Sequence, residues 1–189
     1  MPKTSDVILS DIKRNLGQRW YSAMISVIGG STCTPAVRTK TEELGREIAL
    51  HNAVLVCGGL SGVMEAACKG ASKAGGLTIG ILPGDDRRDA NKYVSIAIPT
   101  GMGIARNALV VKSGQVVIAA EGHYGTLSET GLALAEHIPV ISMGSWEFFR
   151  HGKKDTKIIY ADSPRDAVEK AIDAAYKAAK SDFKHWRTR

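Results

Sequence analysis

Residues 24–31 read Met-Ile-Ser-Val-Ile-Gly-Gly-Ser, and this stretch decides the fold. A short apolar run that ends at glycine is typical of a buried strand followed by a tight turn. Similar runs, most of which end at or near glycine or proline, recur at residues 53–57, 77–82, 94–98, 116–120, 139–142 and 157–160. The chain is therefore expected to contain six or seven buried strands.

Segments with helical spacing of apolar residues lie between most of these strands, at residues 39–50, 63–73, 104–111 and 127–136. A last helix is expected to begin with Ser163 as N-cap and Pro164 at its first position. Strands that alternate with helices predict a mostly parallel sheet, and right-handed crossovers cover both of its faces. We therefore expect an α/β protein with a single doubly wound, Rossmann-like domain and a sheet of six or seven strands.

The 189 residues carry a formal net charge of +6, and the basic excess lies at the two ends of the chain. Residues 23–175 contain 16 basic and 16 acidic side chains. We expect an N-terminal extension over residues 1–22, a nucleotide- or phosphate-binding domain over 23–180 and a basic tail over 181–189. Because the domain itself is neutral, its charge gives little support for nucleic acid as a partner.

Apolar runs are short throughout, and none approaches the ~18 residues that span a bilayer. No apolar core typical of a signal peptide occurs between Lys3 and Arg19. The three cysteines form no CxxC pair, and the histidines show no ligand spacing, so no metal site is predicted. These features predict a cytoplasmic protein with no membrane attachment and with free thiols.

Three glycine-rich loops follow predicted strands and lead toward helices. Ligands in this fold class bind beyond the carboxyl ends of the strands. Glycine lets the backbone approach a ligand closely, and a helix N-terminus offers N–H groups to a phosphate. The loops predict a site for a small phosphorylated ligand, and the alternative is that their glycines serve only tight turns. The expected ligand-binding residues in these loops are Gly29, Gly30, Ser31, Gly58, Gly59, Gly62, Gly122, His123, Tyr124, Gly125 and Thr126.

Two common nucleotide motifs are missing from these loops. No GxGxxG follows the first strand, which argues against the usual dinucleotide fingerprint. No GxxxxGK[ST] occurs either, so nucleotide hydrolysis of the P-loop kind is not expected.

Three segments resemble the LOG superfamily of Rossmann-like proteins: Gly-Gly-Leu-Ser-Gly-Val-Met-Glu-Ala at 58–66, Thr-Gly-Met-Gly-Ile-Ala-Arg-Asn at 100–107 and Glu-Gly-His-Tyr-Gly-Thr-Leu-Ser-Glu at 121–129. The resemblance covers roughly residues 24–160 and is strongest to the branch that contains the molybdenum-cofactor carrier proteins. It implies that the protein binds a nucleotide or a molybdopterin-type cofactor and requires no cofactor of its own. The alternative that it implies is a phosphoribohydrolase, which splits a nucleoside monophosphate into base and ribose 5-phosphate.

The resemblance also suggests roles for individual residues. The catalytic pair of the LOG enzymes corresponds to Arg106 and Glu129, and Met102 and Asn107 are expected to contact the ligand. Departures from the family pattern are Glu121 in place of a proline, His123 in place of a glycine and Asn107 in place of a lysine. They leave open whether the protein is an enzyme. Lysine decarboxylation, once attributed to this superfamily, is excluded because no lysine lies at a glycine-loop strand end to hold pyridoxal phosphate.

Each catalytic candidate also has a structural alternative. Residues 126–129 read Thr-Leu-Ser-Glu, so Glu129 fits a capping box in which it bonds back to the Thr126 N–H. Arg106 fits an ordinary surface or interface ion pair. The family resemblance further implies a homodimer or homotetramer, with residues 104–111 and the helix after Thr126 as candidate interfaces.

Overall fold

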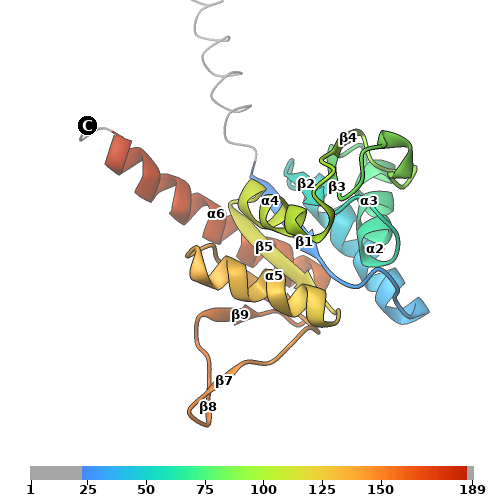
Figure 1. The fold of residues 1–189 in the computed structure, drawn as a ribbon. Coiled ribbons are helices and arrows are strands. Elements are labelled where there is room, and N and C mark those ends of the chain that lie inside the picture. Colours follow the sequence, from blue (N-terminus) through green and yellow to red (C-terminus); the bar gives the residue numbers. More distant parts are fainter. Residues whose placement is uncertain (1–22, 187–189) are drawn as a thin grey trace, which may run out of the picture.

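The computed structural model describes residues 23–186 and shows one α/β domain (Figure 1). Seven strands form a sheet in the order β4-β3-β2-β1-β5-β6-β9, and every neighbouring pair is parallel. This confirms the predicted fold class. The strands are β1 (Met24–Ile28), β2 (Val54–Cys57), β3 (Thr78–Leu82), β4 (Ile96–Pro99), β5 (Val116–Ala120), β6 (Val140–Met143) and β9 (Ile158–Tyr160).

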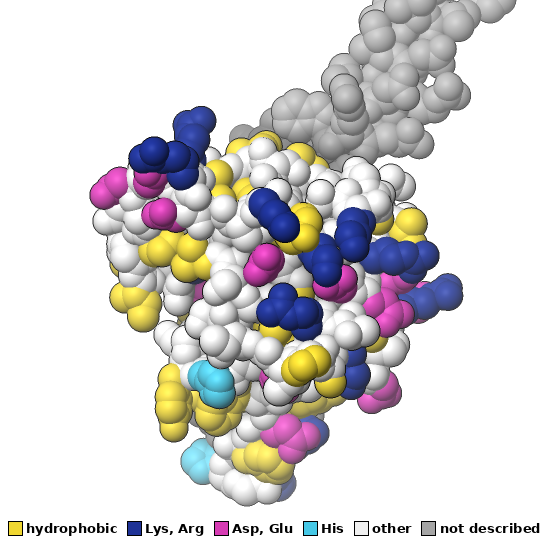
Figure 2. All heavy atoms as spheres, turned by 90° about the vertical axis from the view of Figure 1, so that its right-hand side faces the viewer, with side chains coloured by type: hydrophobic (Ala, Val, Ile, Leu, Met, Phe, Trp, Pro, Cys, Tyr) yellow, Lys and Arg dark blue, Asp and Glu magenta, His cyan; other side chains and the backbone are white. Residues whose placement is uncertain are grey.

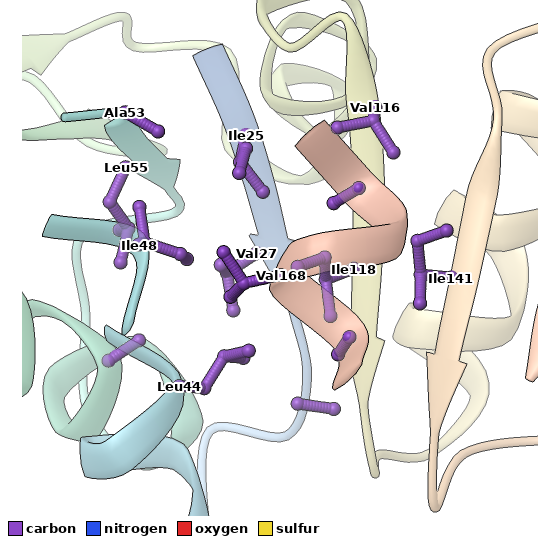
Figure 3. Packing of buried hydrophobic residues seen from close by; sticks show 14 of the residues in the cluster. Ile25, Val27, Leu44, Ile48, Ala53, Leu55, Val116, Ile118, Ile141 and Val168 are labelled. Atoms are coloured by element: carbon purple, nitrogen blue, oxygen red, sulfur yellow. The ribbon is translucent and has the colours of Figure 1, made fainter. Parts of the chain in front are cut away.

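Helices cover both faces of the sheet. One part of the hydrophobic core joins the sheet to α2 (Pro35–Leu50), α3 (Val63–Lys73) and α6 (Pro164–Trp186). Figure 3 shows Leu44 and Ile48 of α2 and Val168 of α6 packed toward the sheet. The other part joins the opposite face to α4 (Asn107–Ser113) and α5 (Tyr124–Ala135). The doubly wound arrangement follows because each central strand is apolar on both faces.

Several element boundaries differ from the prediction. Helix α2 begins at Pro35, four residues before the predicted start, because the Thr34 hydroxyl accepts a hydrogen bond from the Val37 N–H at 3.3 Å. Helix α5 begins at Tyr124 rather than Leu127. The predicted helix at 104–111 divides into the 3₁₀ helix η2 (Gly103–Arg106) and α4.

Three short elements lie outside the predicted pattern: η1 (Arg87–Asp89) and the antiparallel pair β7 (Phe149–Arg150) and β8 (Lys153–Lys154). The final helix begins at Pro164 as expected, with the Ser163 hydroxyl accepting from the Asp166 N–H at 3.2 Å. It runs to Trp186 and so includes part of the segment expected as a basic tail. The expected N-terminal extension, residues 1–22, lies outside the described residues.

The strand order places the topological switch point between β1 and β5. Strands β2, β3 and β4 follow β1 outward in one direction, and the chain then returns to β5 on the other side of β1. The ends of these two strands lie very close together, since a Cβ added to Gly29 would lie 2.7 Å from the Ala120 carbonyl oxygen. A ligand site is expected at this point of an open parallel sheet.

The side that carries α2 and α3 shows both basic and acidic side chains (Figure 2). This mixture agrees with the equal numbers of basic and acidic residues between positions 23 and 175. In the described part of the chain, no helix is both long and apolar enough to cross a membrane.

Candidate functional site

A pocket of about 230 Å³ lies at the switch point, where the ends of β1 and β2 meet the first turns of α4 and α5. Four of the residues that line it, Val27, Ile28, Leu60 and Met64, were not among the predicted site residues. The structure brings together ten of the predicted site residues in this pocket: Gly29, Gly30, Ser31, Gly58, Arg106, Asn107, His123, Gly125, Thr126 and Glu129.

The glycine loop after β1, residues 29–32, and the glycine loop after β2, residues 58–62, are hydrogen-bonded to each other. The Gly30 carbonyl accepts a hydrogen bond from the Val63 N–H at 3.0 Å, and the Ser61 hydroxyl donates to the Ser31 carbonyl at 2.9 Å. Gly62 lies between these contacts with φ +69°, and a Cβ there would lie 2.4 Å from the Gly30 oxygen. The turn therefore requires glycine at position 62 for its own geometry.

The Asn91 side chain stabilises the loop at residues 58–62. Its amide donates to the carbonyls of Gly59 and Leu60, at 3.1 and 2.9 Å. Close by, the buried Sγ atoms of Cys57 and Cys68 lie 3.4 Å apart, and the Gly59 N–H points at Cys57 Sγ from 3.3 Å. The thiols of Cys57 and Cys68 and the side-chain amide of Asn91 thus contact or lie close to the turn at Gly58 and Gly59.

Arg106 is buried, with 7% of its surface exposed, and its guanidinium lies directly over Gly58. A Cβ at Gly58 would approach the guanidinium atoms to 2.5–2.8 Å, so glycine is what makes room for the arginine. Arg106 Nη1 donates to Asn107 Oδ1 at 2.7 Å, and Nη2 reaches the Gly58 carbonyl at 3.5 Å. Its Nε is buried without a partner among the described residues. Arg106 makes no ion pair with a described carboxylate of its own chain, so the surface ion-pair alternative is not supported.

Glu129 lies on α5, is also 7% exposed, and faces the same pocket. The capping-box alternative is wrong, because α5 begins at Tyr124 with His123 as N-cap, which places Thr126 inside the first turn. Burial raises the pKa of Glu129 to about 7, and the positive charge of Arg106 opposes part of this rise. Burial also lowers the pKa of Arg106, although an arginine stays protonated at any ordinary pH.

Five predicted ligand residues do not line this pocket: Gly59, Gly62, Met102, Gly122 and Tyr124. The three glycines all have positive φ, at +72°, +69° and +127°, so they serve the turns themselves. Met102 is half exposed, and Tyr124 is 78% exposed.

The ring of Tyr124 lies against Trp146, with centroids 5.8 Å apart. Trp146 Nε1 in turn donates to the His123 carbonyl at 3.3 Å. The sequence reasoning missed Trp146, although its position shortly after the strand at 140–143 was a usable signal.

Two departures from the LOG pattern change the backbone differently. His123 has φ −108°, which any residue adopts, so its side chain is accommodated without strain. Glu121 has φ +55°, a left-handed conformation that proline, with φ fixed near −65°, cannot adopt. The turn after β5 therefore differs from one built on proline.

A family model described as the SLOG cluster4 family matches residues 22–168. The chain belongs to the SLOG cluster4 family. This family assignment confirms the resemblance predicted from residues 58–66, 100–107 and 121–129.

Proteins similar to this SLOG cluster4 member include solved structures and a curated relative. The molybdenum cofactor binding protein of Rippkaea orientalis is 40% identical with a TM-score of 0.71, over 78% of this chain and 94% of that one. The Moco carrier protein of Chlamydomonas reinhardtii is 33% identical with a TM-score of 0.75, over 82% and 99%. An uncharacterized protein of Archaeoglobus fulgidus is 42% identical over 120 residues, 63% of this chain and 78% of its own length.

The pocket of this SLOG cluster4 protein combines a helix N-terminus with the side chains of Arg106, Thr126 and Glu129. The first turn of α5 contains no acidic residue, and the carboxyl group in the pocket, that of Glu129, comes from the second turn of the same helix. Thr126 in the first turn of α5 and Arg106 from η2 add a hydroxyl group and a guanidinium group to the lining of the pocket. Residues 23–186 contain no cluster of three His, Cys, Asp or Glu side chains placed to hold a metal ion.

Proposed function

We propose that the pocket binds a small phosphorylated ligand, either a nucleotide or a molybdopterin-type cofactor. The observation that carries this proposal is the buried Arg106 guanidinium, which lies over Gly58 with its Nε unpartnered among the described residues. A buried cation with a spare donor is unfavourable unless an anion completes its contacts. The relatives named as molybdenum cofactor binding and carrier proteins support the cofactor version.

The residues around Arg106 fit a phosphate group. Gly29 and Gly30 leave the end of β1 without side chains, so a ligand can approach the backbone. Gly125 and Thr126 belong to the first turn of α5, where the helix dipole favours negative charge. In a bound complex, Arg106 and this turn would hold the phosphate from opposite sides.

Calorimetric titration with inorganic phosphate, ribose 5-phosphate and AMP tests the proposal. Arg106→Gln is expected to weaken binding of all three by about 10-fold or more, because a charge-assisted contact is lost. Arg165→Gln on the exposed side of α6 is the matched control and leaves the affinity unchanged. Equal affinity of wild type and Arg106→Gln would refute the proposal. A purified protein without affinity for molybdopterin would refute the cofactor version alone.

A second candidate function is N-glycosidic hydrolysis of a nucleoside monophosphate. The specific observation in its favour is Glu129, a buried carboxyl with a pKa of about 7 in the same pocket as Arg106. In such a reaction the bond between base and ribose breaks, water adds to the sugar, and a carboxylate stabilises the cationic sugar or activates the water.

Product analysis separates the two functions. Release of adenine and ribose 5-phosphate from AMP, abolished in Glu129→Ala, would support the hydrolase. Tight AMP binding without release over hours would exclude it and leave the carrier function.

We also propose that the protein forms a homodimer or homotetramer through α4 and α5. Glu129 is the sole charged residue of α5 and is buried, so the outer face of this helix carries no charge. Exposed residues on that face are Tyr124, Ser128, Gly131 and Ala135. Ile104, on the neighbouring η2, is 82% exposed. A helix face of small residues without charge suits a protein interface, and a second copy of the chain is the occupant that the family resemblance favours.

A further inference from the structure

Two buried cysteines lie next to the pocket and take no part in the proposed function. Cys57 is the last residue of β2 and precedes Gly58, which lines the pocket, and Cys68 lies on α3. Both side chains are fully buried, and their Sγ atoms are 3.4 Å apart. A disulfide bond requires about 2.0 Å between the sulfur atoms, so a further approach of roughly 1.4 Å would join them. Rotation about one side-chain bond in each cysteine moves the sulfur atoms toward each other.

The surroundings of the two thiols give them different acidities. The pKa of Cys57 is lowered, chiefly because the Cys68 thiol donates a hydrogen bond to the Cys57 sulfur. The Gly59 N–H and the positive charge of Arg106 lower it further, against the opposing effect of burial. The same hydrogen bond raises the pKa of Cys68, and so does burial. Since the thiolate is the form of cysteine that reacts with oxidants, Cys57 is the thiol that reacts first, and Cys68 is placed to react with its product.

The cysteine pair is linked to the pocket through the Gly58 turn. The Arg106 guanidinium lies over Gly58 so closely that a Cβ there would approach it to 2.5–2.8 Å. On the other side of the turn, the Gly59 N–H points at Cys57 Sγ from 3.3 Å. A shift of Cys57 Sγ toward α3 therefore moves a turn that is packed tightly against Arg106.

We propose that Cys57 and Cys68 form a redox-modification site, at which a peroxide converts the two thiols into a reversible disulfide and thereby weakens phosphate binding in the pocket. The effect on binding rests on the proposed function, whereas the formation of the disulfide does not. Both thiols are fully buried, so the oxidant must be small, and hydrogen peroxide meets this requirement.

The reaction balances with hydrogen peroxide as the oxidant. The Cys57 thiolate attacks one peroxide oxygen, so that an S–O bond forms and the O–O bond breaks, and the released hydroxide becomes water with the proton that Cys57 lost. The Cys68 sulfur then attacks Cys57 Sγ, so that an S–S bond forms and the S–O bond breaks, and the hydroxyl group leaves as water with the Cys68 proton. Two electrons pass from the sulfur atoms to the peroxide. Dithiothreitol reverses the change by thiol–disulfide exchange.

The third cysteine separates this site from simple exposure to the oxidant. Cys33 lies in the loop between β1 and α2 and is partly exposed. Exposure alone predicts that peroxide modifies Cys33 and spares the buried pair. The proposal predicts the loss of both buried thiols, and the Cys33→Ser variant makes this loss countable.

Thiol counting tests the modification. The Cys33→Ser protein is treated with hydrogen peroxide and unfolded in denaturant, and its two thiols are expected to be lost to one disulfide within the chain, located by peptide mass spectrometry. Dithiothreitol should restore both thiols. Adding Cys68→Ala removes the second thiol, so oxidation should then stop at a sulfenic acid on Cys57, which dimedone labels. Two remaining thiols in Cys33→Ser, a disulfide between chains, or a sulfinic acid on Cys57 in place of the disulfide overturns the proposal.

Titration with ribose 5-phosphate measures the effect on the pocket. Oxidised Cys33→Ser protein is expected to bind about 10-fold more weakly than the reduced protein, because the charge-assisted contact from Arg106 is disturbed, and dithiothreitol should restore the affinity. The Cys33→Ser, Cys57→Ala, Cys68→Ala protein is the matched control, and peroxide should leave its affinity unchanged. Equal affinities of the oxidised and reduced Cys33→Ser protein overturn the proposed control of binding. If the reduced protein does not bind ribose 5-phosphate, the proposed function fails, while the thiol count still decides whether the disulfide forms.

Discussion

The Arg106 guanidinium and the Glu129 carboxyl are buried in one pocket, and each changes the pKa of the other without forming a direct ion pair. A direct pair would satisfy both groups and leave little for a ligand. Separated as they are, the arginine keeps an unpartnered donor, and the pKa of the glutamate is raised to about 7. The unpartnered donor supports the proposal that the pocket binds an anion.

Glu129 is expected to make stability depend on pH. Its pKa is about 7 in the folded chain against 4.5 for an ordinary glutamate, so the folded state binds the proton more tightly. Its contribution to the free energy of unfolding is complete below pH ~4.5 and is lost as the pH rises to ~7, by up to about 3 kcal/mol. Urea denaturation at several pH values should show Glu129→Gln gaining stability relative to wild type over this window. Glu136→Gln, which alters an exposed ion pair, is the control. Its free energy of unfolding should change with pH in the same way as that of wild type.

Gly58 and Gly62 are expected to differ in what an added methyl group disturbs. At Gly58 the three atoms nearest to the Cβ all belong to the guanidinium of Arg106, so Gly58→Ala should weaken phosphate binding by about 10-fold while changing stability little. At Gly62 the Cβ meets backbone at 2.4 Å and φ is +69°, so Gly62→Ala should destabilise the fold by roughly 1–3 kcal/mol. Thermal melts and phosphate titrations of both variants distinguish the two effects. Wild-type phosphate affinity in Gly58→Ala would contradict the position assigned to Arg106.

Glu121 is expected to be a site of backbone strain. Glu121→Gly removes the left-handed penalty and should stabilise the protein by about 1 kcal/mol. Asn52 has the same φ of +55°, but asparagine tolerates it better, so Asn52→Gly should gain less. Chemical denaturation of the two variants measures the difference. If Glu121→Gly proves less stable than wild type, the Glu121 side chain stabilises the fold by contacts that outweigh the strain.

The uncharged face of α5 is expected to be an interface between copies of the chain. Sedimentation equilibrium should give a mass of two or four 20.2 kDa chains for wild type. Gly131→Lys places a charge on this face and Ile104→Glu places one on the exposed side of η2, and both should shift the protein toward monomer. Leu50→Glu alters an exposed apolar residue on α2 and should leave assembly unchanged. A monomeric wild type would refute the interface.

The sheet was predictable because its strands are encoded locally. Residues 24–28 and 116–120 are apolar runs that end at tight turns, and the order of strands and helices then limits the topology. The pair β7 and β8 was not predictable, since Phe149–Arg150 and Lys153–Lys154 carry no apolar alternation.

The site was predictable only in part, for a similar reason. Glycine loops at strand ends indicated the first pocket, and the family resemblance added Arg106 and Glu129. Whether Glu129 caps α5 depends on where the helix begins, and the sequence around Thr126 fits both possibilities. A separate pocket of about 290 Å³ is lined by Lys40 and Asp162 among others, and these residues are too far apart in the chain for a sequence pattern to join them.

The buried thiols of Cys57 and Cys68, near the Gly58 turn, offer a way to measure local opening of the fold. Cys57 and Cys68 are fully buried, whereas Cys33 is partly exposed, so a thiol reagent can modify the buried pair only when β2 and α3 separate locally. The rate of that modification therefore measures how often the chain next to the Gly58 turn opens. A ligand that holds Arg106 against the Gly58 turn would lower the rate of thiol modification. The ratio of the rates without and with ligand would measure how much the ligand stabilises this part of the fold against opening.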